Sequence, residues 1–305
     1  MSDWRLNTPV AFIIFNRPET TERVFREIAA ARPPMLLVVA DGPVAGNARQ
    51  SGQCAQARAI IERVDWPCQV KLNYSESNLG CRRRVSSGLD WVFEQVPEAI
   101  ILEDDCVPHP TFFRYCEDLL IRYRADQRVG MISGDNFQFG RKVGTGSYYF
   151  SKYAHIWGWA SWRRAWRYYD VNASLWPQFQ ASGDFERVAV PFEREAWRFA
   201  FEGAHSGRID TWDYQWTLAC WCQSMMVILP QVNLVSNIGF GPQATHTHAG
   251  SVYANLQSQE MQWPLLEPSF MATRADADRF TAQHMFSAPL RTRVKRWLKR
   301  VSGLQ

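Results

Sequence analysis

The stretch AIILEDDCVPHPTFF, residues 99–113, decides the fold. Its apolar run ends at three consecutive acids, Glu103, Asp104 and Asp105, before a proline-bounded turn and two phenylalanines. Continuous apolar runs of this kind are typical of strands buried on both faces of a sheet. Adjacent carboxylates raise one another's pKa unless a cation offsets their charge. The stretch therefore predicts a buried strand that carries an acidic cluster to the edge of a sheet.

The same pattern recurs along the chain. Apolar strands are expected at 9–15 and 35–40, and a helix is expected from Thr20 or Thr21, as N-cap, to residue 31. Other periodicities predict helices at 53–64, 82–95, 111–124, 193–202 and 212–224 and strands at 70–73, 100–102, 129–133 and 225–229. This alternation predicts an α/β fold with a mostly parallel central sheet and helices on both faces.

Polar residues stand where the expected strands end. Asn16 and Arg17 follow the first strand, Asp41 follows the second, and the acids at 103–105 follow the fourth. Ligands of such sheets bind beyond the carboxyl ends of the strands. These side chains are therefore expected to converge on one crevice.

Composition fits an ordinary globular protein with a basic end. The 305 residues are 46% hydrophobic and 14% aromatic, and the net charge is +4. No acid follows Asp278, whereas seven Lys or Arg residues do, so the body before them is slightly acidic. We expect a main domain at 1–265, a C-terminal extension at 266–305, and no nucleic-acid partner.

The extension contains an amphipathic pattern at 291–301. Its apolar residues, Val294, Trp297, Leu298 and Val301, have helical spacing, and basic residues fill most of the other positions. This pattern is typical of a helix on an anionic membrane surface. A helix docked on the protein through the same stripe is the alternative.

Cysteine use and hydropathy indicate the compartment. Seven cysteines without CxxC spacing do not suggest a disulfide framework. No apolar run approaches the ~20 residues of a membrane span, and the first apolar stretch is too short for a signal peptide. We expect a reduced, cytoplasmic protein, with a location at the inner face of the membrane if the 291–301 helix binds lipid.

The acids suit a hard metal ion. Oxygen ligands are preferred by Mg²⁺ and Mn²⁺, which usually keep water or bind substrate phosphates. A metal-bound diphosphate at Glu103–Asp105 is therefore expected, with a solvated acidic turn as the alternative.

A strand followed by an acid triplet and a Phe-Phe helix resembles nucleotide-sugar glycosyltransferases of the GT-A fold. The chain resembles the N-acetylglucosaminyltransferase I family, and it also resembles bacterial haemolytic-protein-like glycosyltransferases. The likeness covers about residues 8–250. It includes the segments ISGDN (132–136), WGW (157–159) with Trp162, TWDY (211–214) and PQVNLVSNIGFG (230–241).

The resemblance implies a donor site. Asp105 would coordinate Mn²⁺ (or Mg²⁺) on the donor diphosphate, and Glu103 and Asp104 would hold the donor's sugar and ribose. Arg17 and Asp41 would line the nucleoside pocket.

Further polar residues are expected at the diphosphate or donor sugar. The resemblance places Asn78, Arg82, Arg83 and Arg84 there, and arginine donors suit phosphate oxygens. For the arginines, a solvated helix start is the alternative.

The aromatic loop and a late histidine complete the expected site. Trp157, Trp159 and Trp162 would form an acceptor platform, or else pack under a long loop. His246 or His248 would close on the metal or diphosphate, with ordinary surface or core histidines as the alternative.

Glycosyl transfer also needs a base for the acceptor hydroxyl. The resemblance nominates Asp213, with Asp210 as the fallback because Tyr214 replaces the second acid of the family's pair. The family is inverting, which implies a single in-line displacement.

The resulting prediction is a metal-dependent, inverting glycosyltransferase. It would move a sugar from a UDP-sugar to a glycan acceptor, such as a cell-surface polysaccharide or a lipid-linked precursor. A nucleotidyltransferase and a non-catalytic sugar- or nucleotide-binding protein of the same fold are the alternatives. The first usually has a glycine-rich phosphate loop after the first strand, where this chain reads Asn16-Arg17-Pro18-Glu19.

Overall fold

The computed structural model describes residues 4–240 and 253–285. The strands are β1 (Val10–Ile14), β2 (Met35–Ala40), β3 (Gln69–Tyr74), β4 (Glu98–Glu103), β5 (Cys106–Pro108), β6 (Val129–Ser133), β7 (Tyr148–Ser151), β8 (Trp159–Trp162), β9 (Met226–Pro230) and β10 (Val235–Asn237). The helices are α1 (Pro18–Ala31), α2 (Ala48–Ile61), α3 (Gly80–Gln95), α4 (Thr111–Tyr123), α5 (Arg163–Trp166), α6 (Trp176–Ala181), α7 (Asp184–Val188), α8 (Arg194–His205), α9 (Asp213–Cys222) and α10 (Ala275–Met285).

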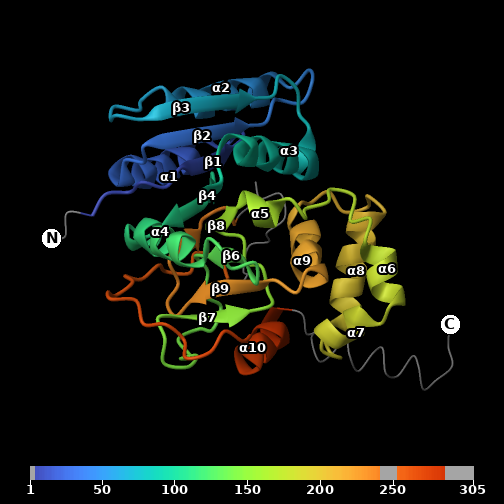
Figure 1. Cartoon of the computed structure of the whole chain (residues 1–305). Coiled ribbons are helices and arrows are strands. Elements are labelled where there is room, and N and C mark those ends of the chain that lie inside the picture. The colour runs from blue at the N-terminus through green and yellow to red at the C-terminus, as the bar shows by residue number, and fades with distance from the viewer. Residues whose placement is uncertain (1–3, 241–252, 286–305) are drawn as a thin grey trace.

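A mixed eight-stranded sheet runs through the molecule in the order β3-β2-β1-β4-β8-β6-β9-β7 (Figure 1). Strands β3, β2, β1 and β4 are parallel, and β6 and β9 run the same way. Strand β8 lies antiparallel between β4 and β6, and β7 is antiparallel to β9. The predicted α/β fold, with a mostly parallel sheet between helices, is confirmed.

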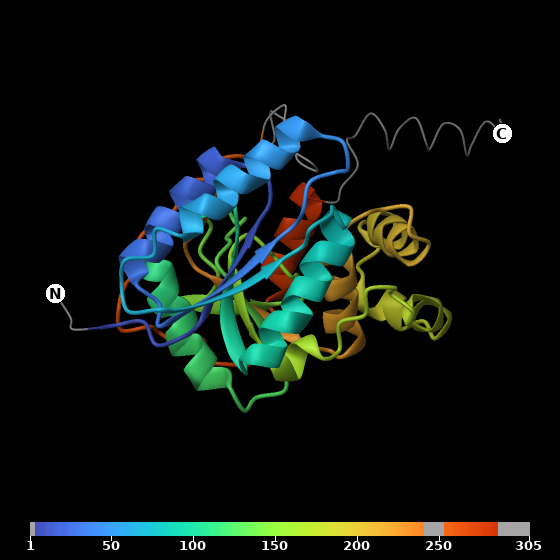
Figure 2. The same cartoon turned by 90° about the horizontal axis from the view of Figure 1, so that it is seen from above.

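Two hydrophobic cores lie on the two faces of this sheet. Alternate residues of β1 divide between them, because successive side chains of a strand point to opposite faces. Val10, Phe12 and Ile14 pack with α1, α2 and α4, whereas Ala11 and Ile13 join the core that includes α3, α5, α8 and α9. Figure 2 shows α1, α2 and α4 on the face opposite α3, with α6–α8 outside α3 on its side of the sheet.

The start of α1 differs from the prediction. The helix begins at Pro18, and Arg17 occupies the N-cap position without a side-chain cap. Thr20 and Thr21 lie inside the first turn and donate their hydroxyls to the Arg17 carbonyl. Proline is well suited to this first position because its missing N–H has no helical partner there. The prediction of a threonine N-cap is therefore wrong, and the true start brings Arg17 to the end of β1.

The region 144–176 contains two strands that the sequence did not predict, β7 and β8. A two-stranded antiparallel ribbon of β5 and β10 also holds the segment after the acids, through the pairs Val235–Pro108 and Asn237–Cys106. This ribbon brings residues distant in the chain to the carboxyl end of β4.

The described part of the expected extension lies against the sheet. The N–H of Arg274 donates to the Phe150 carbonyl, and Ser151 Oγ on β7 donates to Asp278 on α10 at 2.6 Å. No helix among residues 4–240 and 253–285 is long and apolar enough to cross a membrane. The 291–301 segment lies outside the described residues.

Candidate active site

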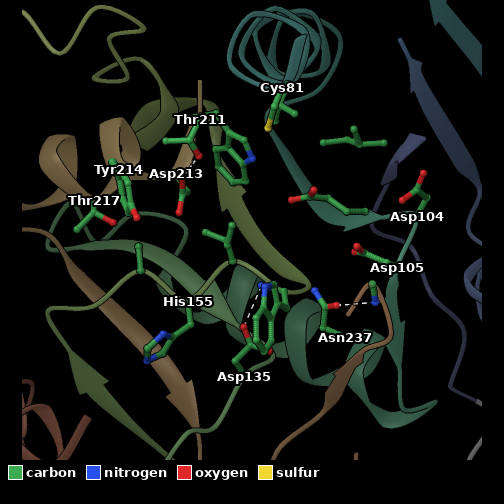
Figure 3. A pocket seen from close by; sticks show the side chains of 18 of the residues that line it. Cys81, Asp104, Asp105, Asp135, His155, Thr211, Asp213, Tyr214, Thr217 and Asn237 are labelled. Carbon is green, nitrogen blue, oxygen red and sulfur yellow. Dashed lines mark hydrogen bonds between the residues drawn. The ribbon is translucent and has the colours of Figure 1, made fainter. Parts of the chain in front are cut away.

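A cavity of about 490 Å³ opens at the edge of the sheet where the parallel strands end. The residues after β1, β2, β4 and β6 line it, together with the segment before β8 and the start of α9. Figure 3 shows the acids Asp104 and Asp105 on one side of the view and Asp213 on the other. Polar side chains from several parts of the chain therefore converge as predicted.

Arg17 is the cation of the acidic cluster. Its guanidinium lies 2.6 Å from Asp105 Oδ2 and 3.3 Å from Asp104 Oδ1. The backbone N–H of Phe15 donates to Asp104 at 3.0 Å, which ties this carboxylate to the end of β1. The register of β1 with β4 makes these contacts, because Ile13 pairs with Glu103.

Burial and mutual repulsion perturb the acids. Burial, and then the charges of Asp105 and Asp104, raise the pKa of Glu103. Burial raises the pKa of Asp104, and the Arg17 charge opposes that rise. Perturbed carboxyl groups in a cleft are typical of functional sites.

A metal ion at the acids would need ligands in addition to those of the described residues. No group of three or more His, Cys, Asp or Glu side chains within 4–240 and 253–285 is arranged to hold a metal. Asp105 offers a carboxylate at the cavity, but Arg17 contacts one of its oxygens. Ions such as Mg²⁺ commonly take one or two carboxylates and complete their shell with water and phosphate oxygens.

Asp41 lines the cavity and also closes a loop. Its carboxylate accepts hydrogen bonds from the N–H groups of Leu79 and Gly80 at 2.9 and 3.2 Å and from Asn78 Nδ2 at 3.0 Å. Burial raises its pKa, and these backbone N–H groups oppose the rise. Asn78 therefore acts on Asp41 in this structure, and both fix the start of α3.

The three consecutive arginines at 82–84 lie in different environments. Arg84 is buried at the cavity wall, but its guanidinium donates to the carbonyls of Ala40 and Asn73 at 3.1 and 2.5 Å. Arg82 donates to the Val171 carbonyl and Arg83 is exposed, and neither lines the cavity. The structure therefore does not gather the run at one point.

The two candidate bases have different places. Asp213 is the first residue of α9 and lines the cavity, where it accepts a hydrogen bond from the Thr211 hydroxyl. Asp210 is exposed, accepts from the Arg82 N–H at 3.2 Å, and is not part of the lining. Position therefore favours Asp213.

The tryptophans of the acceptor prediction also separate. Trp157 lines the cavity, and its ring packs edge-on against Phe240 at 5.5 Å. Trp159 and Trp162 lie on β8, are at most 2% exposed, and belong to the cores on opposite faces of the sheet. Only Trp157 of the three reaches the cavity.

His246 and His248 lie outside the described residues. The structure adds lining residues to which the sequence assigned no role, notably Asp135, His155 and Asn237. Asn237 Oδ1 accepts the N–H of Gly239 at 2.8 Å, beside Asp105. The sequence feature that could have indicated Asp135 is the ISGDN segment that contains it.

Comparisons with known proteins give the following. No protein-family model matches the chain, and no curated protein matches it. Among solved structures, it is similar to a mannosyltransferase from Pyrobaculum calidifontis in complex with GDP-mannose and Mn²⁺, with 15% identity and a TM-score of 0.33, over 52% of this chain. That match covers 45% of the mannosyltransferase, less than half of its length.

Two other solved structures are similar to larger shares of the chain. A UDP-glucose pyrophosphorylase complexed with UDP-glucose has 9% identity and a TM-score of 0.35, over 73% of this chain and 90% of its own. A 4-diphosphocytidyl-2C-methyl-D-erythritol synthase from Anaerococcus prevotii has 11% identity and a TM-score of 0.32, over 64% of this chain and 84% of its own.

Proposed function

We propose that the protein is a metal-dependent, inverting glycosyltransferase that uses a UDP-sugar as donor and a glycan as acceptor. One observation carries the proposal. The cavity at the strand ends has an acidic cluster with Arg17 at one side and the carboxylate of Asp213 at the other. Such an arrangement supports binding of a diphosphate on one side of a sugar and removal of a proton on the other.

The donor binds at the Arg17 side. The guanidinium is suited to the diphosphate oxygens because it presents several donors in a planar fork. Asp105 would hold Mn²⁺ (or Mg²⁺), which when bound offsets the negative charge of the diphosphate. Glu103, Asp104 and Asp41 lie beside this point and shape the donor's side of the cavity.

The reaction uses Asp213 as general base. Its carboxylate accepts the proton of the acceptor hydroxyl, whose oxygen forms a bond to the anomeric carbon of the donor sugar. The bond between that carbon and the diphosphate oxygen breaks, and UDP leaves with the electron pair. Asp213 lies across the view from Asp105 in Figure 3. This arrangement supports the proposal, because in an in-line displacement the acceptor approaches from the side opposite the leaving group.

The decisive experiment compares Asp213→Asn with Asp210→Asn. We expect the first to lose turnover by about 10²–10⁴-fold with unchanged UDP affinity, because general-base catalysis contributes that much. Asp210 is outside the cavity, so its variant is the matched control and should keep turnover. Transfer is measured as UDP released from a panel of UDP-sugars with glycan acceptors.

Product analysis separates the alternatives. A nucleotidyltransferase would release pyrophosphate from a nucleoside triphosphate and a sugar phosphate. A non-catalytic binder would bind the UDP-sugar without releasing UDP, and Asp213→Asn would change nothing measurable. Either result would overturn the proposal.

A further inference from the structure

Two buried polar atoms in the cavity wall have no partner among the described residues. Asp135 follows β6 and is fully buried, and His155 precedes β8 and is 6% exposed. Asp135 Oδ2 accepts the N–H of Trp157 at 2.9 Å, but Oδ1 has no hydrogen bond within residues 4–240 and 253–285. Nε2 of His155 likewise has no hydrogen bond within these residues.

Both groups line the cavity that contains the acids. In the view of Figure 3 they lie on the side opposite Thr211 and away from Asp104. Buried polar atoms are almost always hydrogen-bonded, and one left without a partner costs free energy. Two such atoms on residues that line one cavity point to a ligand that hydrogen-bonds to both.

The surroundings disfavour the charged form of both groups. Burial raises the pKa of Asp135 well above its usual range, opposed only by the Trp157 N–H. Burial lowers the pKa of His155 to about 3. At neutral pH the imidazole is therefore uncharged, and burial favours the uncharged form of Asp135 as well. Such groups match uncharged hydroxyls and are poorly suited to a phosphate or a cation.

Aromatic rings pack against one another in this part of the cavity. Phe137 packs edge-on against His155, with ring centroids 4.5 Å apart, and against Trp157 at 5.2 Å. All three line the cavity. Apolar walls with a few placed polar groups are the usual composition of a small-molecule site, and aromatic faces cover the C–H faces of pyranose rings.

We infer that Asp135 and His155 form a subsite that binds the hydroxyl groups of a neutral sugar ring. The inference rests on the proposed function for the place of the diphosphate. It gives the hydroxyl contacts to residues other than Glu103 and Asp104, of which Asp104 is already paired with Arg17.

The test measures affinity for UDP, UDP-glucose and UDP-N-acetylglucosamine by calorimetry. Asp135→Leu and His155→Phe should each lower the affinity for the UDP-sugars by about tenfold and leave UDP unchanged, because each removes one hydrogen bond to the ring. Unchanged UDP affinity also shows that a variant is folded. Tyr115→Phe is the matched control, because it removes a buried hydroxyl that lies outside the cavity and has no hydrogen bond within the described part of the chain.

Asp135→Asn tests the protonation state. Its amide N–H takes the place of the acid proton while its carbonyl accepts from Trp157, so UDP-sugar affinity should be retained. Loss of affinity in this variant would contradict a neutral Asp135. Saturation-transfer NMR with free glucose and N-acetylglucosamine separates an acceptor ring from a donor ring, because only the former binds without UDP.

The outcomes separate the subsite from the proposed function. If the wild type binds UDP and Asp135→Leu binds the UDP-sugars and free sugars as well as the wild type, the subsite is overturned and the donor site stands. If the wild type binds free sugar through Asp135 but no UDP, the subsite stands and the proposed donor fails. Binding of none of these probes overturns both.

Discussion

Replacement of Arg17 by glutamine removes the cation that stabilises the acidic cluster. Its guanidinium is the only ion-pair partner of Asp104 and Asp105 among the described residues, and those carboxylates are 4% and 13% exposed. Removal of one partner from a buried ion pair costs about 3–5 kcal/mol. Because Arg17 itself is 25% exposed, we expect a loss near the lower end, about 3 kcal/mol, in the free energy of unfolding at pH 7.

Urea unfolding of Arg17→Gln, followed by tryptophan fluorescence, measures this loss. Arg63→Gln is the matched control, because Arg63 pairs with Glu22 at 2.6 Å but is 56% exposed. We expect a much smaller change there, since solvent screens an exposed pair. The loss in Arg17→Gln should shrink as the pH falls, because protonation removes the repulsion among the acids.

Mn²⁺ should partly restore the stability of Arg17→Gln. An ion at 100 times its dissociation constant stabilises the folded state by about 2.7 kcal/mol. It should stabilise the wild type less, because Arg17 competes for Asp105. The reasoning is refuted if Arg17→Gln is as stable as Arg63→Gln, or if Mn²⁺ stabilises both the variant and the wild type equally.

Two further predictions concern stability. A Cβ at Gly88 on α3 would lie 2.3 Å from Val39 Cγ1, so Gly88→Ala should lower the free energy of unfolding in urea by about 1–3 kcal/mol. Gly52 on α2 has nothing within 4 Å of an added Cβ, so Gly52→Ala should raise that free energy by up to about 1 kcal/mol. Equal effects of the two substitutions would contradict this prediction. Burial raises the pKa of Asp278 from 3.8 to about 6, so its stabilising contribution is complete below pH 3.8 and disappears as the pH rises through 6. Asp278→Asn should therefore gain about 3 kcal/mol relative to wild type between pH 3.8 and 7, and a pH-independent difference would contradict the shift.

The strands that carry the donor site could be predicted because their residues are apolar on both faces. The runs at Val10–Ile14 and Met35–Ala40 are almost completely buried, so a continuous apolar pattern was sufficient. The acids after β4 and Arg17 after β1 followed from the rule that strand ends meet at one edge. Their direct ion pair depends on the β1–β4 register, which one sequence does not reveal.

The sequence predicted the wrong location for residues whose pattern fits both a binding site and the protein core. Trp159 and Trp162 read equally well as a sugar platform and as core, and the structure places them in β8, buried on both sides. In sequence Arg84 is compatible with a phosphate ligand, but in the structure its guanidinium donates to backbone carbonyls of β2 and β3. Asp135 is an ordinary acid in sequence and becomes notable only through burial.

The central claim is that a nucleoside diphosphate and a metal ion bind together at the acids after β4. Calorimetric titration of UDP, with and without Mn²⁺, on the wild type and on Asp105→Ala tests it most directly. The account predicts UDP binding that requires Mn²⁺ in the wild type and is absent in Asp105→Ala. No UDP binding by the wild type in either condition, or binding that Asp105→Ala leaves unchanged, would contradict it.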